Sequence, residues 1–467
     1  MSNKRFIGNH PWIPNLDEEI IREMLEKIGV NKIEDLFSDI PSNLKIDRIL
    51  DVGFKEPLSE MELERIALQD SKGVKDSSEF LVFTGGVCKH FIPYVIDVLV
   101  KRAEFYTSYT PYQPEISQGM LQALFEYQSL MADLLEMDVV NASMYDGSTA
   151  LAEAILMALR LTRKKKILVP STMNPEYYEV IKTYLEPHSI NIVKVNYDPD
   201  TGLLDLNDLD KKIDSETAAI YIENPTFLGF IESQVDEISE VVHRNNALFI
   251  VGVDPISLGI LRPPGDYDAD IVVGEAQPLG IGLNYGGPYL GIFAVRDDYK
   301  IVRQMPGRII GMTTSADGKE TGFTMILQTR EQHIRREKAT SNICTNEALC
   351  ALRAAIYLSL VGPEGLKNIG LKILRNSHYA LDKIRKIEGV DAPIFSSSFF
   401  KGFPVKFKEK NVGTINRELF KRGILGGLPI DKDFLGIQNL SLYCFTEILS
   451  FKDIDFLVEK LTEVIGD

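Results

Sequence analysis

Lysine is absent from a long central stretch of this chain, between Lys212 and Lys300. Chemistry that needs a lysine amine must therefore use a residue outside this stretch. Long apolar runs are also absent: residues 247–253 form the strongest run, and Asp254 and Pro255 end it far short of the length that spans a bilayer. No apolar signal core precedes residues 12–14. We therefore expect no membrane partner and no secretory leader.

Cysteine, histidine and basic charge are scarce as well. The four cysteines show neither disulfide-pairing nor metal-ligand spacing, which suits a reducing cytoplasm; they are Cys88, Cys344, Cys350 and Cys444. The six histidines are isolated, so we expect no metal site. A net charge of −16 leaves no basic surplus to neutralise phosphates and argues against a nucleic-acid partner. Neither the glycine pattern of dinucleotide-binding folds nor that of P-loops occurs.

The 467 residues are too many for one ordinary core, so we expect more than one domain. Residues 1–71 are predicted to form an N-terminal helical arm. Asn15 is placed to cap a first helix, which Gly29 would end. Ser59 and Glu62 form the sequence pattern of a capping box for a second helix.

Residues 72–338 alternate short runs rich in Val and Ile with stretches that suit helices. The predicted strands are residues 167–169, 192–195, 218–222, 247–253 and 271–273. This alternation is typical of βαβ units, so we predict a large α/β domain with a mostly parallel sheet and helices on both faces. Residues 339–467 combine long helical stretches with a few short strands and are predicted to form a small C-terminal α+β domain.

The strongest candidate for ligand chemistry is the segment 146–150, which reads Asp-Gly-Ser-Thr-Ala and opens a predicted helix. Backbone N–H groups, the hydroxyls of Ser148 and Thr149, and the helix dipole would together suit a phosphate. The alternative is that Asp146 or Ser148 only caps the helix. The residues alone favour neither interpretation.

Two further segments could contact a ligand. Residues 104–119 are rich in tyrosine and proline, so they predict a stiff aromatic loop that could reach a flat cofactor or seal an interface. A purely structural role is the alternative for this loop. Asp254 follows a predicted buried strand, at the end of a parallel sheet where ligands commonly bind. A turn residue before Pro255 is the alternative for Asp254.

The segments 104–119, 141–153, 270–291 and 336–346 resemble the glycine cleavage system P-protein family, glycine dehydrogenase (decarboxylating). Within that family the chain is similar to subunit 1, the N-terminal half where the enzyme is split into two chains. The resemblance covers nearly the whole length. It implies the aspartate-aminotransferase type of fold, that of type I pyridoxal-phosphate enzymes, with a large sheet domain and a small C-terminal domain.

The resemblance also implies a partner. In this family the sister subunit 2 carries the lysine that binds pyridoxal phosphate covalently, within a histidine–lysine pair; here Gln277 and Pro278 stand in that place. The implied assembly contains two copies of each chain, decarboxylates glycine, and transfers the aminomethyl group to the lipoyl arm of H-protein. On this basis Tyr109, Tyr112 and Gln113 are expected to reach the partner's active site. Ser148, Thr149 and Asp254 occupy the family's phosphate and ring-nitrogen positions, as relics or as working contacts.

Two alternatives to this obligate subunit remain open. An independent pyridoxal enzyme would need a lysine from elsewhere in the chain, such as Lys89 or Lys338, and neither ends a predicted strand. A non-catalytic regulatory or binding protein on the same scaffold is the second alternative. The intact aromatic loop, with Tyr109 to Gln113, argues against this second alternative.

Overall fold

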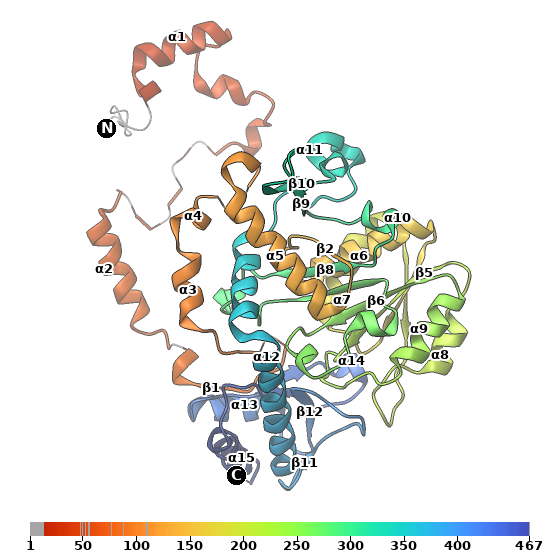
Figure 1. Cartoon of the computed structure of the whole chain (residues 1–467). Helices are drawn as coiled ribbons and strands as arrows, with labels where there is room; N and C mark the ends of the chain where they lie inside the picture. Colours follow the sequence, from red (N-terminus) through yellow and green to blue (C-terminus); the bar gives the residue numbers. More distant parts are fainter. Residues whose placement is uncertain are drawn as a thin grey trace. The chain divides into compact units, whose positions relative to one another are not determined.

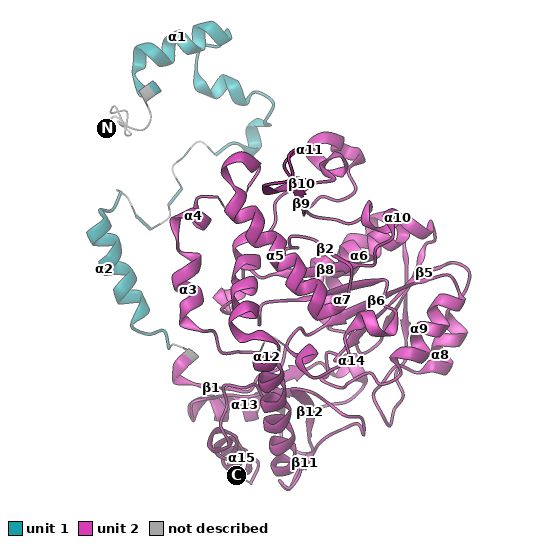
Figure 2. Ribbon diagram, in the orientation of Figure 1, with its two compact units in different colours: residues 1–75 teal, residues 76–467 magenta. Residues whose placement is uncertain are grey.

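The computed structural model describes residues 14–46, 48, 50–51, 53–54, 57–75, 77–86, 88–108 and 111–466. Tyr109, one of the predicted site residues, lies outside the described residues. The chain divides after Lys75 into two compact units, which Figure 2 colours separately. The predicted boundaries at residues 71/72 and 338/339 stay predictions.

The first unit contains two capped helices, α1 (Glu18–Ile28) and α2 (Glu60–Ser71). Asp17 caps α1 with its carboxylate, which accepts from the N–H of Glu19 at 2.9 Å. The predicted cap Asn15 is wrong, because a 3-10 turn over Pro14–Leu16 precedes the helix. Gly29 ends α1 at φ 88°, as predicted. The capping box of α2 is confirmed.

The second unit is built on a seven-stranded sheet in the order β2-β8-β7-β6-β5-β3-β4. The five strands β4, β3, β5, β6 and β7 run parallel, and β8 is antiparallel to its neighbours. The prediction of a mostly parallel sheet is therefore confirmed. The strands are β2 (Val139–Val140), β3 (Lys166–Pro170), β4 (Asn191–Val195), β5 (Thr217–Asn224), β6 (Leu248–Val253), β7 (Ile271–Glu275) and β8 (Gly291–Val295).

Helices cover both faces of this sheet (Figure 1). Successive strand residues point to opposite faces, so each strand contributes apolar side chains to two separate cores. Phe249 and Val251 of β6 join the core beneath α5, α9 and α12, whereas Ile250 joins the core beneath α6 and α7. The helices are α3 (Tyr94–Val100), α4 (Ala103–Tyr106), α5 (Gln118–Leu135), α6 (Gly147–Thr162), α7 (Pro175–Leu185), α8 (Leu206–Lys212), α9 (Val235–Arg244), α10 (Tyr299–Val302), α11 (Gln332–Arg335) and α12 (Ala348–Ile384). An antiparallel hairpin, β9 (Ile309–Thr314) and β10 (Thr321–Ile326), packs on α5.

The long helix α12 connects the large sheet to a smaller one. Its first half packs against α5, and its second half lies in a separate aromatic core with the C-terminal elements. A non-helical Gly362 at φ 63°, followed by Pro363, interrupts it. Among the described residues α12 alone is long and apolar enough to cross a membrane, and its buried side chains instead form part of the protein core.

The smaller sheet has the antiparallel order β11-β12-β15-β14. The short strand β1, far earlier in the chain, pairs in parallel with β13, and Thr84, two residues after the strand, bridges to Tyr443. Residues 81–84 thus lie beside C-terminal strands that are more than 300 positions away. The elements are β1 (Leu81–Val82), β11 (Val390–Asp391), β12 (Gly402–Phe407), α13 (Val412–Lys421), β13 (Ile424–Leu425), β14 (Leu428–Ile430), α14 (Lys432–Leu435), β15 (Leu440–Cys444) and α15 (Phe451–Gly466).

Candidate functional site

A cavity of about 510 Å³ lies where the carboxyl ends of β6 and β7 meet residues of the smaller sheet. Asp254 and Glu275 enter it from these strand ends, and Lys401 and Tyr443 enter it from the other side. Ligands of open parallel sheets bind at this end because the strands and the helices that follow them leave a crevice there. Ser148 and Asp254, two of the predicted site residues, both line this cavity, whereas Thr149 is not among the lining residues.

The start of α6 is already occupied by carboxylates. Asp146 caps the helix through the N–H of Thr149 at 2.7 Å, and it also accepts from the hydroxyls of Ser148 at 2.8 Å and Thr149 at 2.9 Å. The N–H of Gly147 donates to Glu275 at 3.0 Å. The hydroxyls that could cradle a phosphate are thus directed at a side chain of the protein. The capping interpretation of this segment describes the observed geometry.

Strand β7 ends in a carboxylate that holds three loops together. Besides Gly147, Glu275 accepts from the N–H groups of Gln277 at 2.9 Å and Leu290 at 3.2 Å. Burial raises the pKa of Glu275 to about 7, against the lowering effect of these backbone donors. The amide of Gln277 turns inward and donates to the carbonyl of Ile281 at 2.6 Å.

A second buried carboxylate, Glu223, lies near the end of β5 and also accepts from backbone N–H groups. It accepts from the N–H groups of Asn174 at 3.0 Å and Phe227 at 2.9 Å. Burial raises its pKa to about 7 as well. Tyr177 and Tyr221 line the cavity between these carboxylates, and both phenol pKa values are raised, first by burial and then by the nearby negative charges.

The lysine that lines this cavity is Lys401, which sequence reasoning missed. Its Nζ lies 2.6 Å from Oδ2 of Asp254, and the two side chains are 22% and 14% exposed. Burial alone would raise the pKa of Asp254, but the positive charge of Lys401, then His90 and local hydrogen bonds, outweigh it and lower the pKa. The two lysines considered from the sequence, Lys89 and Lys338, are not among the residues that line the cavity.

A disulfide joins Cys88 to Cys444 at the rim of the cavity. The expectation that no cysteines pair is therefore wrong. Their positions are 356 residues apart, so no local spacing could have indicated the bond. The segment after β1 lies beside strand β15, since the N–H of Cys444 donates a hydrogen bond to the Phe83 carbonyl at 2.9 Å. This contact brings the two sulfurs together.

The aromatic loop lies apart from the cavity. Tyr112 and Gln113 do not line it, and both side chains are exposed on the surface of the unit, Tyr112 to 48%. The hydroxyl of Tyr112 accepts from Arg308 at 3.2 Å, and the Arg308 guanidinium stacks over its ring at 4.7 Å. The structure therefore does not bring Tyr112 and Gln113 together with Ser148, Thr149 and Asp254.

Large apolar side chains are exposed on and around this loop. They include Phe91 (63%), Tyr94 (80%), Tyr106 (63%) and Ile116 (76%). Single exposed apolar residues are ordinary, but several aromatic ones on the segment 91–116 are typical of a protein–protein interface. This segment therefore suits contact with another chain.

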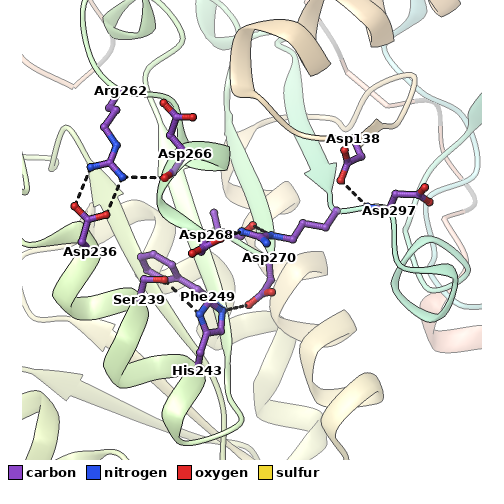
Figure 3. A network of polar contacts seen from close by, with 12 residues as sticks. Asp138, Asp236, Ser239, His243, Phe249, Arg262, Asp266, Asp268, Asp270 and Asp297 are labelled. Atoms are coloured by element: carbon purple, nitrogen blue, oxygen red, sulfur yellow. Dashed lines mark hydrogen bonds and ion pairs between the residues drawn. The ribbon is translucent and has the colours of Figure 1, made fainter.

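A polar network at the opposite ends of the strands resembles a catalytic triad in its residue types (Figure 3). Ser239 Oγ lies 3.3 Å from His243 Nδ1, and His243 Nε2 lies 3.0 Å from Asp270 Oδ2. Asp270 also accepts from the N–H of Phe249 at 2.8 Å. Ser239 is buried and lies one helical turn before His243 on α9. The serine is therefore inaccessible to a substrate, and the network fixes α9 to the sheet.

Two solved structures of low sequence identity share this fold. The chain shares the architecture of a NifS-like protein, with a TM-score of 0.63 at 15% identity over 83% of this chain and 99% of that one. A sphingosine-1-phosphate lyase of Burkholderia pseudomallei aligns with the same TM-score at 13% identity, over 89% of this chain and 94% of that one. The fold is that of type I pyridoxal-phosphate-dependent enzymes, as expected from the sequence.

Much stronger similarities identify the family. A crystal structure of glycine decarboxylase (P-protein) of the glycine cleavage system, in inhibitor-bound form, aligns with a TM-score of 0.83 at 39% identity over 96% of this chain and 98% of that one. Proteins called probable glycine dehydrogenase (decarboxylating) subunit 1 are 56% identical in Staphylothermus marinus, over 99% of both chains, and 51% identical in Saccharolobus solfataricus, over 98% of both. The family model "Glycine cleavage system P-protein" matches residues 10–460. The chain belongs to this family, which confirms the resemblance inferred from the sequence.

The side chains in the cavity do not suit pyridoxal phosphate, the cofactor that the fold implies. A phosphate at the start of α6 would meet the carboxylates of Asp146 and Glu275 in place of free donors. A ring nitrogen at Asp254 would compete with the ammonium of Lys401. We therefore derive no chemical step at this cavity.

Proposed function

We propose that this chain is subunit 1 of a heteromeric glycine decarboxylase and that it supports an active site whose cofactor is held by a second subunit. One observation carries the proposal. Strand β7 ends at Glu275 and is followed by Gln277 and Pro278, and the lysine that lines the cavity, Lys401, is paired with Asp254 at 2.6 Å. The relatives' name, subunit 1, supports the existence of a partner.

In the proposed complex, this chain supplies a wall of the partner's active site. Tyr112 and Gln113 lie on an exposed loop bordered by apolar side chains, which suits an interface, and we assign Tyr109 to the same wall. Tyrosine offers a ring face and a hydroxyl, so these residues would position glycine and exclude water. When bound to the partner, pyridoxal phosphate supplies the electron sink for decarboxylation.

Ser148, Thr149 and Asp254 have a structural role in this proposal. Ser148 and Thr149 stabilise the start of α6 through Asp146, and Asp254 binds Lys401. Loss of the cofactor would have left a cavity whose buried groups needed new partners, because an unpaired buried charge is costly. The carboxylates and Lys401 provide such partners.

We further propose that the complex contains two copies of each chain, works in the cytoplasm, and passes the aminomethyl group to the lipoyl arm of H-protein. An independent pyridoxal enzyme is the second candidate, because Lys401 is a lysine inside the cavity. Its ion pair with Asp254 and the surrounding carboxylates disfavour a bound phosphate there.

One experiment separates the two candidates. The purified chain is titrated with pyridoxal phosphate, alone and with subunit 2, followed by absorbance, borohydride reduction and peptide mapping. We expect no lysine adduct on this chain in either case, and an adduct on the partner together with glycine-dependent release of carbon dioxide. A reduced adduct at Lys401 would establish an independent enzyme. Absence of glycine turnover in the reconstituted complex would instead support a non-catalytic regulatory or binding role for this chain.

A further inference from the structure

Arg308 is a buried arginine outside the cavity, just before β9, and it contacts several segments at once. Its side chain is 4% exposed, and Nη1 lies 2.6 Å from Oε2 of Glu331, which is buried to a similar degree. Nη2 donates to the hydroxyl of Tyr112 at 3.2 Å and to the carbonyl of Cys344 at 2.6 Å. Removing a charged side chain from water costs free energy, so a buried arginine needs a paired charge and hydrogen-bond acceptors.

The two exposed segments that Arg308 joins are far apart in sequence. One is the aromatic loop with Tyr112 and Gln113. The other, residues 340–346, is anchored at Ile343, which is buried in the core, and exposes Asn342 and Thr345 to solvent. Without Arg308, the described hydrogen bonds leave no direct link between the Tyr112 hydroxyl and this second segment.

Only an arginine fits this arrangement. Its planar guanidinium presents several donors in a fixed fork, so one group can pair with a carboxylate and donate to a phenol and a carbonyl. Its flat face also stacks on the Tyr112 ring, 4.7 Å from the ring centre. A lysine would keep the charge for Glu331 but lose the fork and the stacking.

We infer that Arg308 is a positioning residue: it fixes the Tyr112 loop and residues 340–346 as one surface, and residues 340–346 are a second part of the site that this chain offers to its partner. The inference rests on the proposed function for the role of that surface. The link itself concerns this chain alone and can be measured without the partner.

The first measurement is hydrogen–deuterium exchange of the full chain. In Arg308→Lys, amides of residues 112–118 and 340–346 should exchange roughly ten- to hundredfold faster, since hydrogen bonds to a charged group are lost. In Tyr112→Phe, only residues 112–118 should respond. Arg303→Lys is a matched control, because Arg303 donates to the Tyr299 hydroxyl at 3.0 Å and stacks on its ring at 5.3 Å on the exposed surface.

The second measurement uses the complex with subunit 2. Arg308→Lys and Tyr112→Phe should each lower kcat/KM for glycine by about tenfold, as expected for one lost contact of about 1.4 kcal/mol. The double variant should lose no more than Arg308→Lys alone, because the hydrogen bond that Tyr112→Phe removes is already lost in Arg308→Lys. Assembly with subunit 2, followed by sedimentation, should be unchanged.

The outcomes distinguish this inference from the proposed function. If Arg308→Lys behaves like Arg303→Lys in exchange and turnover while Tyr112→Phe lowers turnover, Arg308 is not a positioning residue and the proposed function stands. If exchange responds but Tyr112→Phe and Gln113→Ala leave turnover unchanged, the link exists and the assignment of the site is wrong. If Arg308→Lys fails to fold, Tyr112→Phe decides: unchanged exchange over residues 112–118 overturns the inference.

Discussion

Replacement of Lys401 with methionine should destabilise the chain, because Asp254 would stay in the cavity without its positive partner. The two groups lie 2.6 Å apart, with side-chain exposures of 22% and 14%. Removal of one member of a buried ion pair costs about 3–5 kcal/mol. Since both groups retain some solvent contact, we expect a loss of about 3 kcal/mol in the free energy of unfolding at pH 7.

The loss should depend on pH with a definite sign. In the native chain the pKa of Asp254 is lowered despite its burial, so its contribution to stability is present above the unfolded pKa of about 4 and is lost as the pH falls through the folded value. In Lys401→Met the effect of burial dominates and raises the pKa. The variant should therefore be most destabilised near neutral pH, and the difference from the native chain should shrink as the pH approaches 4.

Urea unfolding followed by circular dichroism at pH 7 and pH 4 measures both effects. Lys408→Met is the matched control, because Lys408 and Asp391 form a similar pair at 3.0 Å that is 54% and 46% exposed, and we expect a loss below about 1 kcal/mol. Adding Asp254→Asn to Lys401→Met should restore most of the stability, since the unpaired charge is removed. Equal losses for Lys401→Met and Lys408→Met at pH 7 would refute the reasoning.

Three further outcomes are expected. The pKa of Glu275 is raised to about 7, so ionising this buried carboxyl costs about 3 kcal/mol and destabilises the native chain as the pH rises from about 5 to 7. Glu275→Gln cannot ionise, so the free energy of unfolding of this variant should vary less over the same pH range. Cys88→Ser, or reduction of the Cys88–Cys444 disulfide, should lower the unfolding free energy by about 2–4 kcal/mol, and a thiol count that shows no disulfide in the native chain would contradict this. Ser59→Ala should cost about 1 kcal/mol of helix stability at α2, detectable as faster amide exchange over residues 60–64, with Ser42→Ala as a control that leaves this helix unchanged.

Local patterns predicted most of the secondary structure and the fold class. The strands between residues 167 and 273 were predictable because each is a run rich in β-branched residues between turn residues. For example, the strand predicted to end at residue 253 ends at Val253. The end of α1 at Gly29 and the capping box of Ser59 and Glu62 follow from equally local signals. The cap at Asn15 failed because a neighbouring acidic residue, Asp17, competes for the same role.

The candidate site was less predictable, because its contacts join distant positions. The sequence indicated Ser148 and Asp254, but it gave no reason to place Lys401 beside Asp254, which is 147 residues earlier. The same applies to Arg308, which connects Tyr112 to Cys344. An isolated lysine or arginine carries no spacing that distinguishes a buried partner from a solvated charge.

The sequence by itself determined the family, the alternation of strands and helices, and the absence of a lysine between Lys212 and Lys300. These properties depend on residue identity and on neighbours within a few positions. Only the tertiary structure decided that the start of α6 is filled by carboxylates, that Lys401 neutralises Asp254, and that Cys88 bonds to Cys444. Those outcomes depend on which side chains the packed sheets bring within about 3 Å of each other, since hydrogen bonds form only over such distances.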